Sequence, residues 1–235
     1  MIRNSILLLC VFSVFLVQGS FSQNSQTEEH AYMMVQSIQK FHYFPKEVND
    51  TYSESVFDRF IEITDPFGVI FTKSDLQDLA KYKHSIDDDI LKKESSFLND
   101  ISTKYNERLT EIRSWYVNST DIDLDFPEND SITFSNNSPE LSKDEQDLFR
   151  MKILKFKVLT ECMLSNDSVL NVEDFSAQKR NEAKQNIIKN EICRLESKIS
   201  DPESFEKYVH SAYLHSVAYA FDPHTDYFSG EDMDM

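Results

Sequence analysis

Glycine limits what this chain can fold into more than any other feature, because only three of its 235 residues are glycines: Gly19, Gly68 and Gly230. Phosphate-binding loops, dinucleotide-binding folds, nucleophile elbows and β-rich domains need glycine where the backbone adopts a positive φ angle. None of these can be recognised here. Glu, Lys, Leu and Ile are abundant instead, so the composition predicts an all-α protein.

Size and charge narrow the class further. The chain is long enough for one or two domains, and 40% hydrophobic with 28% charged residues is typical of a globular protein. Its formal net charge is -17. Nucleic-acid phosphates and anionic membrane surfaces would be repelled by this charge, which argues against both as partners. A basic partner is permitted, although acidic surfaces more often serve solubility.

Residues 1–22 have the pattern of a signal peptide. Arg3 precedes an apolar run over residues 6–17, which is short for a membrane span. Small residues at Ser20 and Ser22 mark a cleavage point, and a second option lies at residues 17–19. Cleavage would leave a periplasmic or secreted chain with no stable membrane span. An uncleaved anchor is the alternative.

Two cysteines, Cys162 and Cys193, remain after such cleavage. In an oxidising compartment they could form one disulfide. Two buried free thiols on apolar helical stripes are equally consistent with the pattern. Their spacing fits no zinc motif, and the sequence indicates neither a metal nor a cofactor.

Hydrophobic periodicity near 3.6 predicts a bundle of about seven helices. Candidate capping boxes begin at Thr51, Ser74 and Ser142. Residues 121–139 are rich in Asp, Asn, Ser and Pro, which predicts a long exposed loop or a small hairpin. The expected helices cover about Thr27–His42, Thr51–Thr64, a short stretch from Ser74, one long helix over Ser85–Asn118, Ser142–Met163, Val172–Ile199 and Asp201–Phe221.

The segment Asp222–Ser229 carries the densest set of potentially reactive side chains. Asp222, His224 and Asp226 alternate there, and His210 and His215 lie upstream. These residue types could hold a metal or form a Ser-His-Asp site. Hydrolytic triads, however, are assembled from separated segments over a rigid oxyanion hole, which this glycine-poor chain does not suggest. Helix termination explains the segment better.

A similar pattern earlier in the sequence supports that interpretation. Asp65–Phe71 shares with Asp222–Phe228 the form Asp-Pro, three residues, apolar, Phe, and each segment follows an amphipathic helix. We therefore expect each to stop its helix, turn, and return large apolar side chains to the core. The run Asp87-Asp88-Asp89 is interpreted as a solvated helix face. Trp115 and the phenylalanines are interpreted as core.

Six short motifs occur in an order that has a known counterpart. They are Phe41-His42-Tyr43 with Pro45, Ser53–Phe60, Asp65–Phe71 with Asp75, Arg108, Lys152–Lys157, and Asp222–Ser229. Together they resemble the N-terminal helical domain of the tail-specific proteases, also called carboxy-terminal processing peptidases. The resemblance covers nearly the whole chain after the signal peptide. Each motif alone is weak, whereas their order and spacing are fairly specific.

In that family the helical domain precedes a PDZ domain and a serine protease domain with a Ser-Lys dyad. After the signal peptide over 1–22, the resemblance therefore implies a helical domain over 23–229 and a truncated linker over 230–235. It implies no catalytic, cofactor-binding or metal-binding residue here, because the Ser-Lys dyad has no counterpart in these residues.

Three interpretations of function stay open. In the first, the chain is a non-catalytic module that engages a protein substrate or an envelope adaptor. In the second, it belongs to an active endopeptidase whose other domains are encoded downstream or were lost by a frameshift. The third is an unrelated secreted helical binding protein. The oligomeric state is left open.

Overall fold

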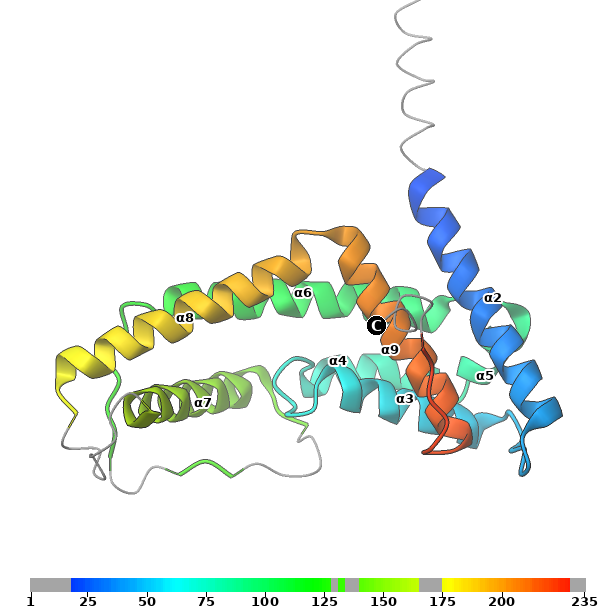
Figure 1. Cartoon of the computed structure of the whole chain (residues 1–235), viewed down its shortest axis with the longest axis horizontal. Coiled ribbons are helices and arrows are strands. Elements are labelled where there is room, and N and C mark those ends of the chain that lie inside the picture. Colours follow the sequence, from blue (N-terminus) through cyan, green and yellow to red (C-terminus); the bar gives the residue numbers. More distant parts are fainter. Residues whose placement is uncertain (1–17, 128–130, 134–139, 165–174, 229–235) are drawn as a thin grey trace, which may run out of the picture. The chain divides into compact units, whose positions relative to one another are not determined.

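The computed structural model describes residues 18–127, 131–133, 140–164 and 175–228, with side chains from residue 26 onward. Within these ranges the chain is helical, and no strand occurs (Figure 1). The elements are α2 (Gln18–Phe41), α3 (Asp50–Thr64), α4 (Lys73–Leu79), the short 3-10 helix η1 (Ala80–Tyr82), α5 (Ile86–Lys92), α6 (Ser96–Asn118), α7 (Lys143–Leu164), α8 (Ala177–Ile199) and α9 (Pro202–Phe221).

The all-α class predicted from composition and periodicity is confirmed. The described parts of the 121–139 region, residues 121–127 and 131–133, form a loop with no hairpin. Side chains of α7 and α8 hold this loop: Lys184 donates to the carbonyl of Ile122 at 2.8 Å, and Lys155 pairs with Asp125 at 2.9 Å. The expected start of the helix at Val172 lies outside the described residues, and α8 begins after an N-cap at Ser176.

The chain divides into two compact units, which are described separately. The first unit comprises Met1–Phe60, Lys81–Asn99 and Val209–Met235. Phe97 is the centre of its core, with its ring 5.6 Å from Phe60, 5.7 Å from Phe57 and 6.2 Å from Tyr213, centroid to centroid. Such tilted and edge-on aromatic contacts stabilise a core beyond the area that they bury. Helix α2 packs against α5 in this unit.

The second unit comprises Ile61–Ala80 and Asp100–Tyr208. Helices α7 and α8 pack against each other through buried apolar residues that include Leu154, Val158, Ile188 and Leu195. A second cluster surrounds Tyr105, whose ring stacks on Phe205 at 5.8 Å and on Tyr208 at 6.1 Å.

A turn over residues 65–72 is fixed in the second unit by buried polar groups. Asp65 accepts hydrogen bonds from the backbone N–H groups of Val69, Ile70 and Phe71 at 2.8 to 2.9 Å. Gln146 of α7 donates to the carbonyls of Gly68 and Phe71 at 3.1 and 2.7 Å. Because Gly68 has a φ of 64°, glycine is used here where the backbone needs it.

The single long helix predicted over Ser85–Asn118 is wrong, because the chain breaks between α5 and α6. Lys93 is left-handed, with φ 57° and ψ 46°, and it ends α5. Glu94 N–H then bonds to the carbonyl of Asp89 at 2.8 Å, and the Asp89 carboxylate accepts from Phe97 N–H at 3.1 Å. Neither glycine nor proline marks this break in the sequence. The hydrophobic periodicity therefore runs through it and predicts one helix.

Two predicted capping boxes are displaced. Helix α4 is capped by Thr72 with Asp75 as the reciprocal partner, not by Ser74 with Gln77. Helix α3 is preceded by Asn49, whose side chain accepts from Tyr52 N–H, in place of Thr51. The box at Ser142 with Glu145 is confirmed, since each side chain bonds to the backbone or side chain of the other.

Two surface assignments are also corrected. Asp87 and Asp89 are buried, and only Asp88 of that run lies on the solvated face. Ser53 explains the burial of Asp87, because its hydroxyl donates to the Asp87 carboxylate at 2.6 Å and accepts from Asp87 N–H at 2.8 Å. The assignment of Trp115 and all phenylalanines to the core is also wrong in part, because Trp115 is half-buried and several phenylalanines are exposed: Phe41, Phe44, Phe67, Phe156 and Phe228.

Candidate functional site

Within the described residues 222–228, the acidic side chains make hydrogen bonds that close a turn and pair with a histidine of α9. Asp222 accepts a hydrogen bond from His224 N–H at 2.7 Å, which closes the turn after α9. Asp226 pairs instead with His215, at 2.5 Å between Oδ1 and Nδ1. His224 is exposed, and Ser229 lies outside the described residues. The segment therefore serves as a helix terminus in the described structure.

Two other histidines, His42 and His210, have partners in the first unit. His42 lies 3.7 Å from Asp222 and so connects the start of the α2–α3 loop to the end of α9. His210 is buried and shares a 3.0 Å hydrogen bond with the Thr27 hydroxyl. Burial lowers the pKa of His210 below its ordinary value, because the charged imidazolium is poorly solvated there. Within the described residues, no group of three His, Cys, Asp or Glu side chains could hold a metal ion.

The predicted structural similarity between Asp65–Phe71 and Asp222–Phe228 is only half confirmed. Both carboxylates accept backbone N–H groups and stop their helices. Phe71 returns to the core and is buried, as expected. Phe228 does not return, since 65% of its surface is exposed.

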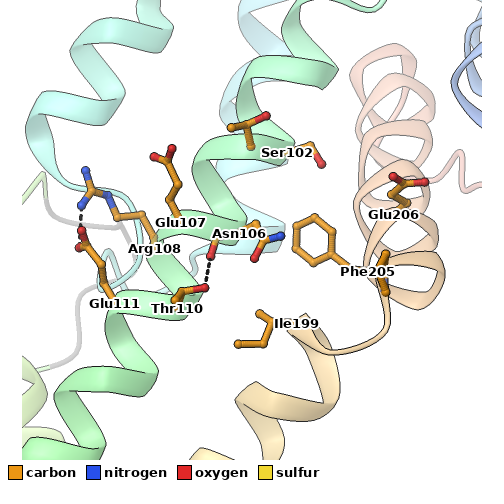
Figure 2. Close-up of a pocket in the computed structure, with 11 residues that line it drawn as sticks. Ser102, Asn106, Glu107, Arg108, Thr110, Glu111, Ile199, Phe205 and Glu206 are labelled. Carbon is orange, nitrogen blue, oxygen red and sulfur yellow. Dashed lines mark hydrogen bonds and ion pairs between the residues drawn. The ribbon is translucent and has the colours of Figure 1, made fainter. Parts of the chain in front are cut away.

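A groove of about 690 Å³ lies in the second unit, between α6 and the segment where α8 ends and α9 begins (Figure 2). The lining side chains are Ser102, Thr103, Asn106, Glu107, Arg108, Thr110 and Glu111 from α6, with Ile199, Pro202, Phe205 and Glu206 opposite.

The apolar part of the groove comes from α8 and α9. One face of Phe205 stacks on Tyr105 of the core, with the ring planes inclined by 23°. Figure 2 shows its ring directed towards Asn106, with Ile199 nearby. Phe205 is 7% exposed, so most of its aromatic ring is packed against the core. This gives the groove a fixed apolar floor.

The polar part comes mainly from α6. Ser102, Asn106 and Thr110 recur every four residues and so lie along one side of the helix. Thr110 donates its hydroxyl proton to the backbone carbonyl of Asn106 at 3.0 Å. Glu107, Arg108 and Glu111 project from the other side of α6 in Figure 2.

Arg108 anchors this second side through Asp75. Its Nε and Nη2 atoms donate to the two carboxylate oxygens of Asp75, each at 2.7 Å, and Nη1 donates to Glu111 at 2.7 Å. Burial by itself raises the pKa of Asp75, but the hydrogen bonds from Arg108 and Thr72 outweigh it and hold that pKa below its ordinary value. The guanidinium is thus committed to structure and is not free to hold a ligand.

The eleven lining side chains include hydroxyl, amide, guanidinium and carboxylate groups beside the apolar floor. Asn106 offers an amide donor and acceptor, and Glu206 offers a carboxylate. Sequence reasoning missed this site; the four-residue polar spacing on α6, beside its apolar stripe, is the signal that could have indicated it.

Cys162 is buried and Cys193 is exposed, and both are free thiols. The predicted alternative of a disulfide is therefore wrong, and so is burial of the second thiol. Burial raises the pKa of the Cys162 thiol. Among the described residues, no helix is long and apolar enough to cross a membrane.

The described residues form an all-helical fold with a groove in its second unit. Comparison of the sequence with protein families agrees: the profile of the tail-specific protease N-terminal domain matches residues 34–231. The chain belongs to this family. No match was found among curated proteins. The match is to the N-terminal domain of the family alone, and it removes the third interpretation, an unrelated helical protein.

Proposed function

We propose that this chain is the non-catalytic helical domain of a tail-specific protease system and that it engages a protein, either a substrate or an envelope adaptor that delivers one. The family supports the relation to proteolysis. The single observation that carries the binding role is the groove between α6 and α9, which combines a rigid apolar floor with uncommitted polar groups.

A location in the periplasm or outside the cell belongs to the same proposal. It rests on the signal-peptide pattern of residues 1–22. In this scheme residues 23–229 are the helical domain and 230–235 begin a linker.

The second candidate is that the domain works as the first part of an active serine endopeptidase. The family name favours it, because an N-terminal domain in this family belongs to a protease. The DNA sequence that follows this coding region distinguishes the two candidate functions. A PDZ-protease sequence directly downstream, in frame or frame-shifted, would support the endopeptidase, and unrelated sequence there would exclude it.

Photo-crosslinking tests engagement at the groove. A benzoylphenylalanine at Asn106 is compared with one at Lys189, which is exposed on α8 and does not line the groove. We expect the Asn106 position to capture a defined envelope protein that Lys189 does not. Asn106→Trp should also slow turnover of the captured protein in cells, whereas Lys189→Trp should not. Equal capture at both positions, or unchanged turnover, would contradict the proposal.

Peptidase activity of the chain itself is tested separately. The chain from residue 23 should leave an unstructured protein with an apolar tail intact, because the described histidines are not arranged as a base beside a nucleophile. Cleavage that disappears in Ser229→Ala or His224→Ala would overturn this expectation.

A further inference from the structure

We infer that the groove takes a polypeptide segment in which a Lys or Arg adjoins a large apolar side chain. This inference rests on the proposed function and specifies the kind of protein segment that the site recognises. It is carried by three features of the groove: its apolar floor, its uncommitted amide and its single uncommitted carboxylate.

The floor selects a large apolar side chain. Ile199 is half-buried and Phe205 is nearly buried, and both lie at the junction of α8 and α9 with Pro202. Because Phe205 is stacked on Tyr105, it cannot turn away to open a deep cavity. A ligand side chain must therefore lie flat against this floor, which suits a phenyl or leucyl group attached to an extended backbone.

Asn106 can form hydrogen bonds with the backbone of that segment. Its side chain is exposed and makes no hydrogen bond within the described part of the chain, so both its N–H and its C=O are available. Figure 2 shows it facing Phe205 across the groove. A backbone that crosses between the two could exchange two hydrogen bonds with one amide, as asparagine side chains commonly do.

Charge selects a cation beside the apolar group. Of the three lining carboxylates, Glu107 pairs with Lys104 at 2.9 Å, and Glu111 pairs with Arg108 and Lys143 at 2.7 and 3.3 Å. Glu206 makes no ion pair with any described residue. It adjoins Phe205 in the sequence, so a cation that pairs with it would neighbour the apolar side chain on the floor.

Other occupants fit less well. An acidic peptide or a nucleic acid would face Glu206 and the chain's net charge of -17. A second copy of the chain would carry the same excess charge. Arg108, the lining guanidinium that could attract an anion, is already held by Asp75 and Glu111.

Fluorescence anisotropy with three labelled octapeptides tests the inference on the mature chain. The first peptide carries a central Lys-Phe pair among Gly and Ser, the second has Glu in place of Lys, and the third has Ser in place of Phe. We expect the first to bind at least tenfold more tightly than the other two. Binding should weaken in 0.5 M salt, because an exposed ion pair is screened.

Two variants assign the effect to residues. Glu206→Gln should weaken binding of the Lys-Phe peptide by three- to tenfold and remove most of the discrimination against the Glu-Phe peptide. Glu47→Gln, an equal charge change at an exposed loop residue of the first unit, should leave binding unchanged. Helical content measured by circular dichroism checks that each variant is folded.

The outcomes separate this inference from the proposed function. Capture at Asn106 without preference for the Lys-Phe peptide overturns the inference and leaves protein engagement intact. Preference for that peptide without capture or an effect on turnover supports the inference and contradicts the proposed role in proteolysis. Equal binding of all three peptides, or no effect of Glu206→Gln, overturns the inference.

Discussion

Arg108 and Asp75 form a two-pronged ion pair in which Nε and Nη2 of the guanidinium each lie 2.7 Å from a different carboxylate oxygen. The pair joins the middle of α6 to the first turn of α4. Asp75 also closes the capping box of α4, because it accepts from Thr72 N–H and from the Thr72 hydroxyl. One carboxylate therefore holds a helix start and a neighbouring helix together.

Loss of this carboxylate should destabilise the fold. Asp75→Ala is expected to lower the free energy of unfolding by about 3 kcal/mol, because it removes a cap and leaves a partly buried guanidinium short of a partner. Urea denaturation measures it. Asp78→Ala, at an exposed position of the same helix, is the control and should change stability by less than about 0.5 kcal/mol.

The same pair predicts a pH dependence. The folded pKa of Asp75 lies below its ordinary value, so its stabilisation is present above about pH 4 and is lost as the pH falls through the folded pKa. The stability difference between wild type and Asp75→Ala should therefore shrink on acidification below pH 4. A constant difference down to pH 2 would contradict the assignment.

Gln146 should contribute as much to the free energy of unfolding as a large core residue. It is buried, and it supplies donors to two carbonyls of the 65–72 turn while it accepts from Arg150 at 3.0 Å. Gln146→Leu keeps the volume but leaves those carbonyls unpaired, which is expected to cost about 2 to 3 kcal/mol. Thermal and urea unfolding measure the loss. Gln178→Leu, on the exposed face of α8, should be nearly neutral.

Lys93 is expected to tolerate glycine and reject β-branched residues. Lys93→Val should destabilise the protein by about 1 to 2 kcal/mol, because its left-handed φ of 57° crowds a branched Cβ. Lys93→Gly should stay within about 0.5 kcal/mol of wild type, since relief of the backbone offsets the lost ion pair with Glu29. Lys92→Val, which also loses an exposed pair, is the matched control. Equal losses for both valine variants would contradict the backbone explanation.

His210 should make the protein less stable in mild acid. Burial keeps its folded pKa below the ordinary value near 6.5, so the unfolded chain takes up a proton first as the pH falls. Stability is then lost below about pH 6.5. His210→Gln should flatten the dependence of the free energy of unfolding between pH 7.5 and 5, as followed by denaturation at fixed pH steps. An unchanged slope would show that other groups dominate.

The two thiols should differ in reactivity. In the chain from Gln23, which contains Cys162 and Cys193 alone, a maleimide should modify Cys193 rapidly under native conditions. Cys162 should react only in denaturant, because it is buried and burial raises its thiol pKa. Mass spectrometry counts the additions. Two native additions at similar rates would contradict this burial.

Much of the fold follows from local patterns, and the exceptions have clear physical causes. The helix from Asp201 and the box at Ser142 are signalled by residues within one turn, so they could be predicted. The break at Lys93 could not, because a buried carboxylate four residues earlier and the packing around Phe97 impose it. The burial of Asp87 could not be predicted for a similar reason, because its partner Ser53 is 34 residues away in the sequence.

The groove depends on still longer separations. Asn106 and Phe205 are almost a hundred residues apart, and no local pattern states that they face each other. The reactive-looking segment at Asp222 was correctly interpreted as a helix terminus because the Asp222 carboxylate acts on a residue only two positions later. Exposure of Phe228 was missed, since an apolar residue in a repeated pattern gives no sign of whether it returns to the core.

The hydrogen bonds that Asp65 and Gln146 make to the 65–72 turn have a consequence for the comparison of related sequences. Asp65 and Gln146 fix the backbone of this turn by hydrogen bonds, and loss of either side chain is expected to destabilise it. Selection would therefore preserve them as strictly as it preserves catalytic groups. An alignment of this family that highlights invariant Asp and Gln at these positions would be marking the framework of a turn, and a search for active-site residues should set them aside.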